Sequence, residues 1–256
     1  MALISQLDEL LPFGLVATRK WLGGHGVSRH TMDNWLKSQK LIPLVRGVMA
    51  RPGVPVTWQG LLVSLDRMMP HPVYVGGVSA LELAGFGHYL KSGQNIRLYS
   101  AESCPGWLNK LTIDVDFSWQ NSRRLWPADW LDSAETCQPV FWREGLPDYL
   151  RASPEQAYLE ALAGVPEQLS FEHADELLQG LTSLSPRRLD VLLLVCQNIK
   201  VKRLFMWFAN RHQYAWYNRL SADDYDLGSG KRVVARGGKL DREFLITVPA
   251  HLHETN

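Results

Sequence analysis

Two helix-start signals with a glycine-rich turn between them constrain the fold of this chain more than any other feature of its sequence. Thr18 is a favourable N-cap for a first helix, and the run Gly-Gly-His-Gly at residues 23–26 ends that helix, because glycine adopts turn conformations without steric cost. Ser28 then caps a second helix, in which Met32 and later apolar residues recur at helical spacing. Two helices joined by such a turn form a helix-turn-helix unit.

A short hairpin follows the second helix. Residues 41–51 alternate weakly between apolar and polar side chains, are divided by Arg46 and Gly47, and are closed by a Pro-Gly pair at 52–53. Helix, turn, helix and hairpin in this order predict a winged helix-turn-helix, and we expect its core to lie within residues 12–54.

Local charge favours a DNA-binding role for this element. The formal net charge of the 256-residue chain is only +1, but residues 1–53 contain seven Lys and Arg against three Asp and Glu. Residues 54–150 contain seven against ten. Because the local excess of cations attracts phosphates, the near-neutral total does not exclude DNA binding. A winged helix used only for protein contact is the alternative.

The exposed face of the second helix carries the predicted DNA contacts. A helix in the major groove reads guanine with arginine and adenine with asparagine, so Arg29 and Asn34 are predicted to contact bases. His30 and Lys37 are predicted phosphate or mixed contacts, and the wing adds an arginine at its tip and one at its base. With the two helix caps, the predicted DNA-binding residues are Thr18, Ser28, Arg29, His30, Asn34, Lys37, Arg46 and Arg51.

The rest of the chain mixes strand and helix patterns. Residues 96–100, 111–119 and 138–142 have the composition of strands, and helices predominate from residue 153 onward. Hydrophobic residues at 46% and charged residues at 21% are typical of a globular protein. We therefore predict an α+β protein with an N-terminal DNA-binding domain over residues 1–93 and a mixed α/β C-terminal domain over residues 94–256.

Several kinds of site are not indicated. Cys104, Cys137 and Cys196 are too few and too widely spaced for a disulfide framework or a zinc site, and the histidines lack metal-ligand spacing. The stretch from Asp226 to Arg232 lacks the first glycine of a phosphate-binding loop and the Ser or Thr that follows its lysine. We expect no metal, cofactor or catalytic residue. Without a signal-peptide pattern or a long apolar run, we expect a cytoplasmic protein.

Asp114 and Asp116 carry the alternative of a metal-dependent, nucleotide-processing enzyme. Two residues apart on a strand, they would point to the same side and could hold a divalent metal for nucleotidyl transfer. Such enzymes place a Gly-Ser turn shortly upstream, and here that pair is missing. A hydrated strand face is therefore the preferred interpretation.

A second basic surface is predicted in the C-terminal half. Cations on a helix near residue 200 and in a glycine-rich loop after residue 228 could face a partner, although such charges are usually the hydrated side of an element. The candidate residues are Lys200, Lys202, Arg203, Lys231 and Arg232.

Five segments occur in a recognisable order through nearly the whole chain. They read RGVMARPG in the wing, then GGVSALELAGFGHYL, SPEQAYLEAL, NIKVKRLFMWFA and LGSGKRVVARGGKLDREFLITVP. In this combination the chain resembles the AbiEi antitoxins of type IV toxin–antitoxin systems, bacterial proteins that repress their own operon.

The resemblance implies an N-terminal winged helix that binds operator DNA with inverted repeats, and a C-terminal antitoxin domain that counters a nucleotidyltransferase-like toxin, generally without a stable complex. It places the recognition helix at Ser28 to Gln39 and the wing at residues 44–51, and it extends the antitoxin role to the C-terminal basic positions. It also assigns nucleotidyltransferase chemistry to the toxin. A protein-interaction module that holds the toxin directly remains an alternative.

Overall fold

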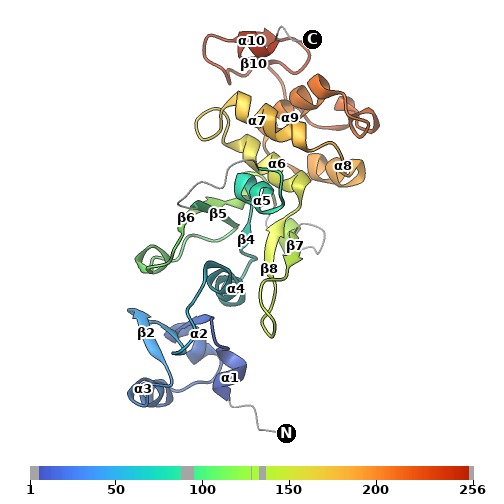
Figure 1. The fold of residues 1–256 in the computed structure, drawn as a ribbon. Helices are drawn as coiled ribbons and strands as arrows, with labels where there is room; N and C mark the ends of the chain where they lie inside the picture. Colours follow the sequence, from blue (N-terminus) through green and yellow to red (C-terminus); the bar gives the residue numbers. More distant parts are fainter. Residues whose placement is uncertain (1–5, 88–94, 128, 133–136, 254–256) are drawn as a thin grey trace. The chain divides into compact units, whose positions relative to one another are not determined.

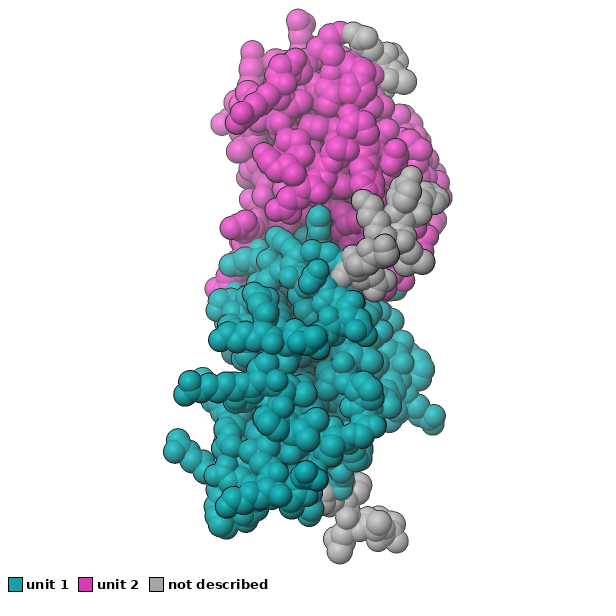
Figure 2. All heavy atoms as spheres, turned by 60° about the vertical axis from the view of Figure 1, so that its left-hand side comes forward, with its two compact units in different colours: residues 1–74, 91–121, 139–151 teal, residues 75–90, 122–138, 152–256 magenta. Residues whose placement is uncertain are grey.

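The computed structural model describes residues 6–87, 95–127, 129–132 and 137–253 (Figure 1). Helices and sheets occur throughout, which confirms the predicted α+β class. No helix in these ranges is long and apolar enough to cross a membrane. The chain divides into two compact units, each built from several segments (Figure 2). Unit 1 comprises residues 1–74, 91–121 and 139–151, and unit 2 comprises residues 75–90, 122–138 and 152–256.

Unit 1 begins with a winged helix, as predicted. Its elements are α1 Gln6–Leu10, β1 Val16–Thr18, α2 Arg19–Gly24, α3 Arg29–Lys37, β2 Ile42–Val45 and β3 Val48–Ala50. The three strands form an antiparallel sheet of order β1-β3-β2, in which β2 and β3 are the predicted hairpin. Strand β1 is not predicted from the sequence, because a three-residue strand gives no periodic signal and its partner β3 is distant along the chain.

Both helices of the helix-turn-helix begin at the predicted caps. The Thr18 hydroxyl accepts a hydrogen bond from the Trp21 backbone N–H at 3.1 Å, and the Ser28 hydroxyl accepts one from Thr31 at 3.0 Å. Each bond satisfies a backbone donor that has no partner within the helix. Leu22 and Met32 are buried beneath the two helices, so the opposite face of α3 is left exposed.

Helix α4 (Trp58–Met68) supports the winged helix from within unit 1. Its residues 60–65 are buried, and the Ser64 hydroxyl accepts a hydrogen bond from the Val16 N–H of β1 at 2.9 Å. Gly60 permits the close approach of this helix, since a Cβ atom there would lie 2.2 Å from the Gly14 carbonyl oxygen. Any larger residue at position 60 would push α4 away from the winged helix.

A second sheet has five strands in the order β6-β5-β4-β8-β7. Their bounds are β4 Tyr74–Val75, β5 Asn95–Ser100, β6 Asp116–Asn121, β7 Cys137–Val140 and β8 Tyr149–Ala152. Strands β5 and β6 are parallel, with Asn95 opposite Asp116. The strand predicted at residues 111–119 is observed as β6, which begins only at Asp116. The residues just before the predicted start, 108–110, form a 3-10 turn.

Unit 2 is mainly helical and contains a two-stranded antiparallel sheet. Its main elements are α5 Gly77–Leu83, α6 Pro154–Ala163, α7 Phe171–Gly180, α8 Pro186–Val195, α9 Ile199–His212, β9 Lys239–Asp241, β10 Ile246–Val248 and α10 Ala250–His253. Residues 157–162 of α6 and 204–209 of α9 are almost fully buried and form the centre of its core. The ring of Phe205 lies 6.2 Å from Tyr158 and 5.9 Å from Trp216, between ring centroids.

A buried carboxylate links α5 and α6. Glu160 is 1% exposed and accepts hydrogen bonds from the Gly77 backbone N–H at 2.9 Å, from Trp126 Nε1 at 3.1 Å and from Gln156 Nε2 at 2.9 Å. The Gly77 N–H lies in the first turn of α5, where no backbone acceptor is available within the helix. The N-terminus of α5 has no side-chain cap of its own, and the Glu160 carboxylate of α6 serves as its N-cap acceptor.

Candidate nucleic-acid interface

Helix α3 exposes a continuous face of polar and charged side chains. Four predicted contacts share this face with one acidic residue: Arg29, His30, Asp33, Asn34 and Lys37 are all exposed. Their spacing forms two rows along the helix, one with Arg29, Asp33 and Lys37 and one with His30 and Asn34. In the second row, Asn34 Nδ2 lies 3.1 Å from His30 Nε2, within hydrogen-bonding distance. The four DNA contacts predicted on α3 therefore lie on one exposed face of the helix.

The wing carries one exposed cation at its turn, in the same small domain as α3. Arg46 is exposed in the turn between β2 and β3, and Gly47, which follows it, has φ 82°. This left-handed conformation is easy for glycine and strained for other residues. The Gly47 carbonyl accepts a hydrogen bond from the Arg19 backbone N–H at 2.9 Å. The wing turn is thus attached to the first residue of α2.

An ion pair that the sequence does not predict connects α2 to the exposed face of α3. Arg19 Nη2 lies 2.8 Å from Asp33 Oδ1, and the two side chains are 41% and 50% exposed. The residues are 14 positions apart, so no local sequence pattern relates them. Only the crossing of α2 and α3 brings them into contact.

Three of the predicted DNA contacts have roles within the protein. The hydroxyls of Thr18 and Ser28 accept the capping hydrogen bonds of α2 and α3. Arg51 forms an ion pair with Asp8 and places its guanidinium 3.7 Å from the centroid of the Phe13 ring, with only 15% of its side chain exposed. The prediction that Arg51 contacts DNA is therefore corrected, because its charge is paired and packed at the base of the wing.

The predicted basic surface of the C-terminal half is wrong for Lys202 and Arg203, which are 3% and 1% exposed. The Arg203 guanidinium donates to four backbone carbonyls: Leu227, Gly228 at 2.9 Å and Gly230 at 2.7 Å in the following glycine-rich loop, and Leu245 at 3.2 Å in the turn before β10. Burial lowers the pKa of Arg203, and the charge of Arg232 lowers it further. Arg203 is thus a structural centre for this loop and not a contact residue.

The other three C-terminal cations divide into two groups. Lys200 is half-buried, and its Nζ donates to the carbonyls of Ala163 and Val165 at 2.9 and 2.7 Å. Burial lowers the pKa of Lys200, an effect that Glu167 opposes. Lys231 and Arg232 are exposed and remain the accessible part of the predicted partner surface.

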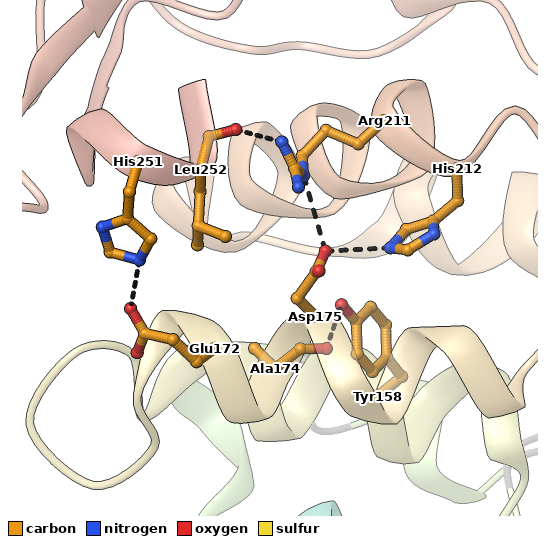
Figure 3. Close-up of polar contacts among 8 residues, drawn as sticks. All are labelled: Tyr158, Glu172, Ala174, Asp175, Arg211, His212, His251 and Leu252. Atoms are coloured by element: carbon orange, nitrogen blue, oxygen red, sulfur yellow. Dashed lines mark hydrogen bonds and ion pairs between the residues drawn. The ribbon is translucent and has the colours of Figure 1, made fainter. Parts of the chain in front are cut away.

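Unit 2 also contains a polar cluster that the sequence does not predict (Figure 3). Asp175 of α7 accepts a hydrogen bond from His212 Nε2 at 2.8 Å and faces Arg211 Nε at 3.5 Å. Arg211 also donates to the Leu252 carbonyl, and His251 lies 3.0 Å from Glu172. These contacts attach α10 to α7 and α9.

Asp175 should make the stability of the protein depend on pH. Burial acts to raise the pKa of its carboxyl, but the hydrogen bond and charge of His212, together with Arg211, outweigh burial and lower the pKa. A lowered folded-state pKa stabilises the protein above the unfolded value, and this stabilisation is lost as pH falls through the folded value. We expect the free energy of unfolding to fall less between about pH 5 and pH 3 in Asp175→Asn than in the unmodified protein.

Urea unfolding at a series of pH values measures this difference. Glu176→Gln, at an exposed position of the same helix, is the matched control and should keep the original pH dependence. Equal pH dependence in the unmodified protein and Asp175→Asn would contradict the assigned role of Asp175.

The residues considered for metal or thiol chemistry form no such site. Asp114 lies in a bend before β6 and Asp116 at its first position, so they are not paired on one strand, and both are exposed. In the described part of the chain, no group of three or more His, Cys, Asp or Glu side chains is placed to hold a metal ion. The three cysteines are unbridged.

Comparison with known proteins assigns both halves of the chain. Residues 1–92 match the family model described as "Transcriptional regulator, AbiEi antitoxin N-terminal domain". Residues 93–249 match the one described as "Transcriptional regulator, AbiEi antitoxin, Type IV TA system". A crystal structure of the RV2827C protein from Mycobacterium tuberculosis is similar, with 17% identity and a TM-score of 0.48 over 91% of this chain and 85% of that chain. A search of curated proteins gives no match.

Proposed function

This chain belongs to the AbiEi family of type IV antitoxins, which are transcriptional regulators and not enzymes, and we propose that it represses its own operon by binding inverted repeats in the promoter. The exposed polar face of α3 carries this proposal. Within the described residues, Arg29, Lys37 and Arg46 form no ion pair, so their charges are available to DNA phosphates. Arg29 and Asn34 have the donor groups that read guanine and adenine in the major groove.

The modest charge of the winged helix favours binding by two copies. Residues 1–53 carry seven cations and three acidic residues, an excess of only four, and two of the seven, Arg19 and Arg51, are engaged in ion pairs. Few phosphate contacts per copy give a weak salt-dependent contribution to affinity. Two copies on the two halves of an inverted repeat double these contacts and match the symmetry of the site.

A double substitution tests the proposed DNA interface. Arg29→Ala combined with Asn34→Ala should reduce binding to a fragment of the protein's own promoter by at least about thirtyfold, because each base contact contributes about 1–3 kcal/mol. Gel mobility shifts measure the affinity. The matched control is Asn218→Ala with Arg219→Ala, which removes an exposed asparagine and arginine from unit 2 and should leave binding unchanged. Full binding by the α3 variant would exclude α3 as the reading element.

We further propose that the second half of the chain, residues 94–256, neutralises a nucleotidyltransferase-type toxin without a stable complex. Lys231 and Arg232 are the accessible candidates for this role.

Co-expression of this protein with the toxin should rescue bacterial growth. This rescue should weaken with Lys231→Ala and Arg232→Ala and persist with the α3 double variant. Co-purification of toxin and antitoxin would favour direct holding of the toxin instead.

A further inference from the structure

We propose that Asp33 determines operator specificity by accepting a hydrogen bond from the exocyclic amino group of a cytosine, and that Arg19 is the residue that positions it. This inference rests on the proposed DNA-binding function. It concerns a carboxylate at the centre of a face that otherwise carries the cations and amides expected of a DNA-reading helix.

The position of Asp33 is unfavourable for DNA binding unless the carboxylate has a specific role. It lies one helical turn from Arg29 and one from Lys37, in the same row on the exposed face. Phosphates would repel an unpaired carboxylate at this position. Its side chain is half exposed, so packing in the core does not require an acidic residue at this position.

Arg19 removes part of this penalty and fixes the carboxylate. Its Nη2 binds Asp33 Oδ1 at 2.8 Å, and the Arg19 backbone N–H is itself bonded to the wing turn at Gly47. Among the described residues, Oδ2 of Asp33 has no hydrogen-bond partner. One oxygen is therefore held within the protein, and the second is available as an acceptor on the face of α3.

The chemistry of base edges identifies the partner of that oxygen. In the major groove, cytosine presents its N4 amino group as a donor, whereas guanine presents only acceptors. Adenine presents an amino group beside the N7 acceptor, which would repel a carboxylate. A fixed carboxylate oxygen therefore favours cytosine over the other bases.

Selection from a pool of randomised DNA duplexes tests the proposal with the full chain. The unmodified protein should enrich a motif that includes cytosine at one position of each half-site. Asp33→Ala should enrich the same motif with the preference at that position reduced about tenfold, as expected for the loss of one base contact. Asp33→Asn should shift the preference at that position towards adenine, because asparagine binds adenine N6 and N7. Arg19→Ala should weaken the cytosine preference without moving it to another position.

The outcomes separate this inference from the proposed function. An unchanged motif in Asp33→Ala, with weaker binding to every sequence, would mean that Asp33 only orients Arg19 towards a phosphate and would overturn the inference. A folded, unmodified protein that enriches no motif would instead refute the proposed DNA-binding function. Circular dichroism of each variant establishes that it is folded, and Asp33 and Arg19 are both exposed enough for this to be expected.

Discussion

Replacing Arg203 with methionine should lower the free energy of unfolding by at least about 3 kcal/mol, because a hydrogen bond to a charged donor contributes about 1.5–3 kcal/mol and the buried guanidinium makes several of them. The guanidinium supplies hydrogen bonds to the carbonyls of Leu227, Gly228, Gly230 and Leu245. Methionine keeps much of the volume of the buried stem and removes every donor. Denaturant unfolding followed by circular dichroism measures the change.

Two further variants identify the cause. Arg232→Met removes an exposed cation from the same region and should change stability by less than about 0.5 kcal/mol. Arg203→Lys keeps the charge but cannot reproduce the planar set of donors, so it should fall between the other two variants. If Arg203→Met were as stable as the unmodified protein, the four hydrogen bonds would not determine the stability of the loop.

Replacing Glu160 with alanine should lower the free energy of unfolding by about 3 kcal/mol. The substitution leaves the N–H groups of Gly77 and Trp126 without acceptors in a buried environment, at about 1–3 kcal/mol for each group. It also removes the acceptor of the Gln156 amide. Unfolding in urea, monitored by tryptophan fluorescence, measures the loss.

A more conservative change separates hydrogen bonding from volume. Glu160→Gln keeps the shape of the side chain but turns one acceptor into a donor that faces another donor, so it should also destabilise the protein by at least about 1 kcal/mol. Glu176→Gln, at an exposed position of α7, makes the same chemical change and should be nearly neutral. Similar stability of the two glutamine variants would contradict a capping role for Glu160.

The winged helix can be predicted from the sequence because its signals are local. Thr18 and Ser28 cap the helices they precede, and the residue pair at 46–47 divides the hairpin. The helices that follow Ser153 and Ser185 begin in the same way, since the hydroxyls of both residues accept capping hydrogen bonds. Side chains that satisfy the backbone within three residues leave a readable pattern.

The roles of charged residues could not be predicted in this way. The partners of Arg203 are backbone carbonyls 24 to 42 residues later in the chain, and any residue type can supply a carbonyl. The sequence therefore predicts that Lys202 and Arg203 lie on the hydrated side of a helix, whereas in the structure both are buried. The pairs Arg19 with Asp33 and Asp175 with His212 likewise depend on how helices cross, which no periodicity encodes.

On α3, the residues that anchor the helix differ from the residues on its exposed face, and this separation has an evolutionary consequence. The side chains that hold the helix in place, Ser28 and Met32, are separate from the row that faces outward. Exposed positions away from the core usually tolerate substitution within about 0.5 kcal/mol of stability. Under the proposed function, the operator and the repressor can therefore change together through a few substitutions in α3. Duplicated operons in one genome can then acquire different specificities while the fold is kept.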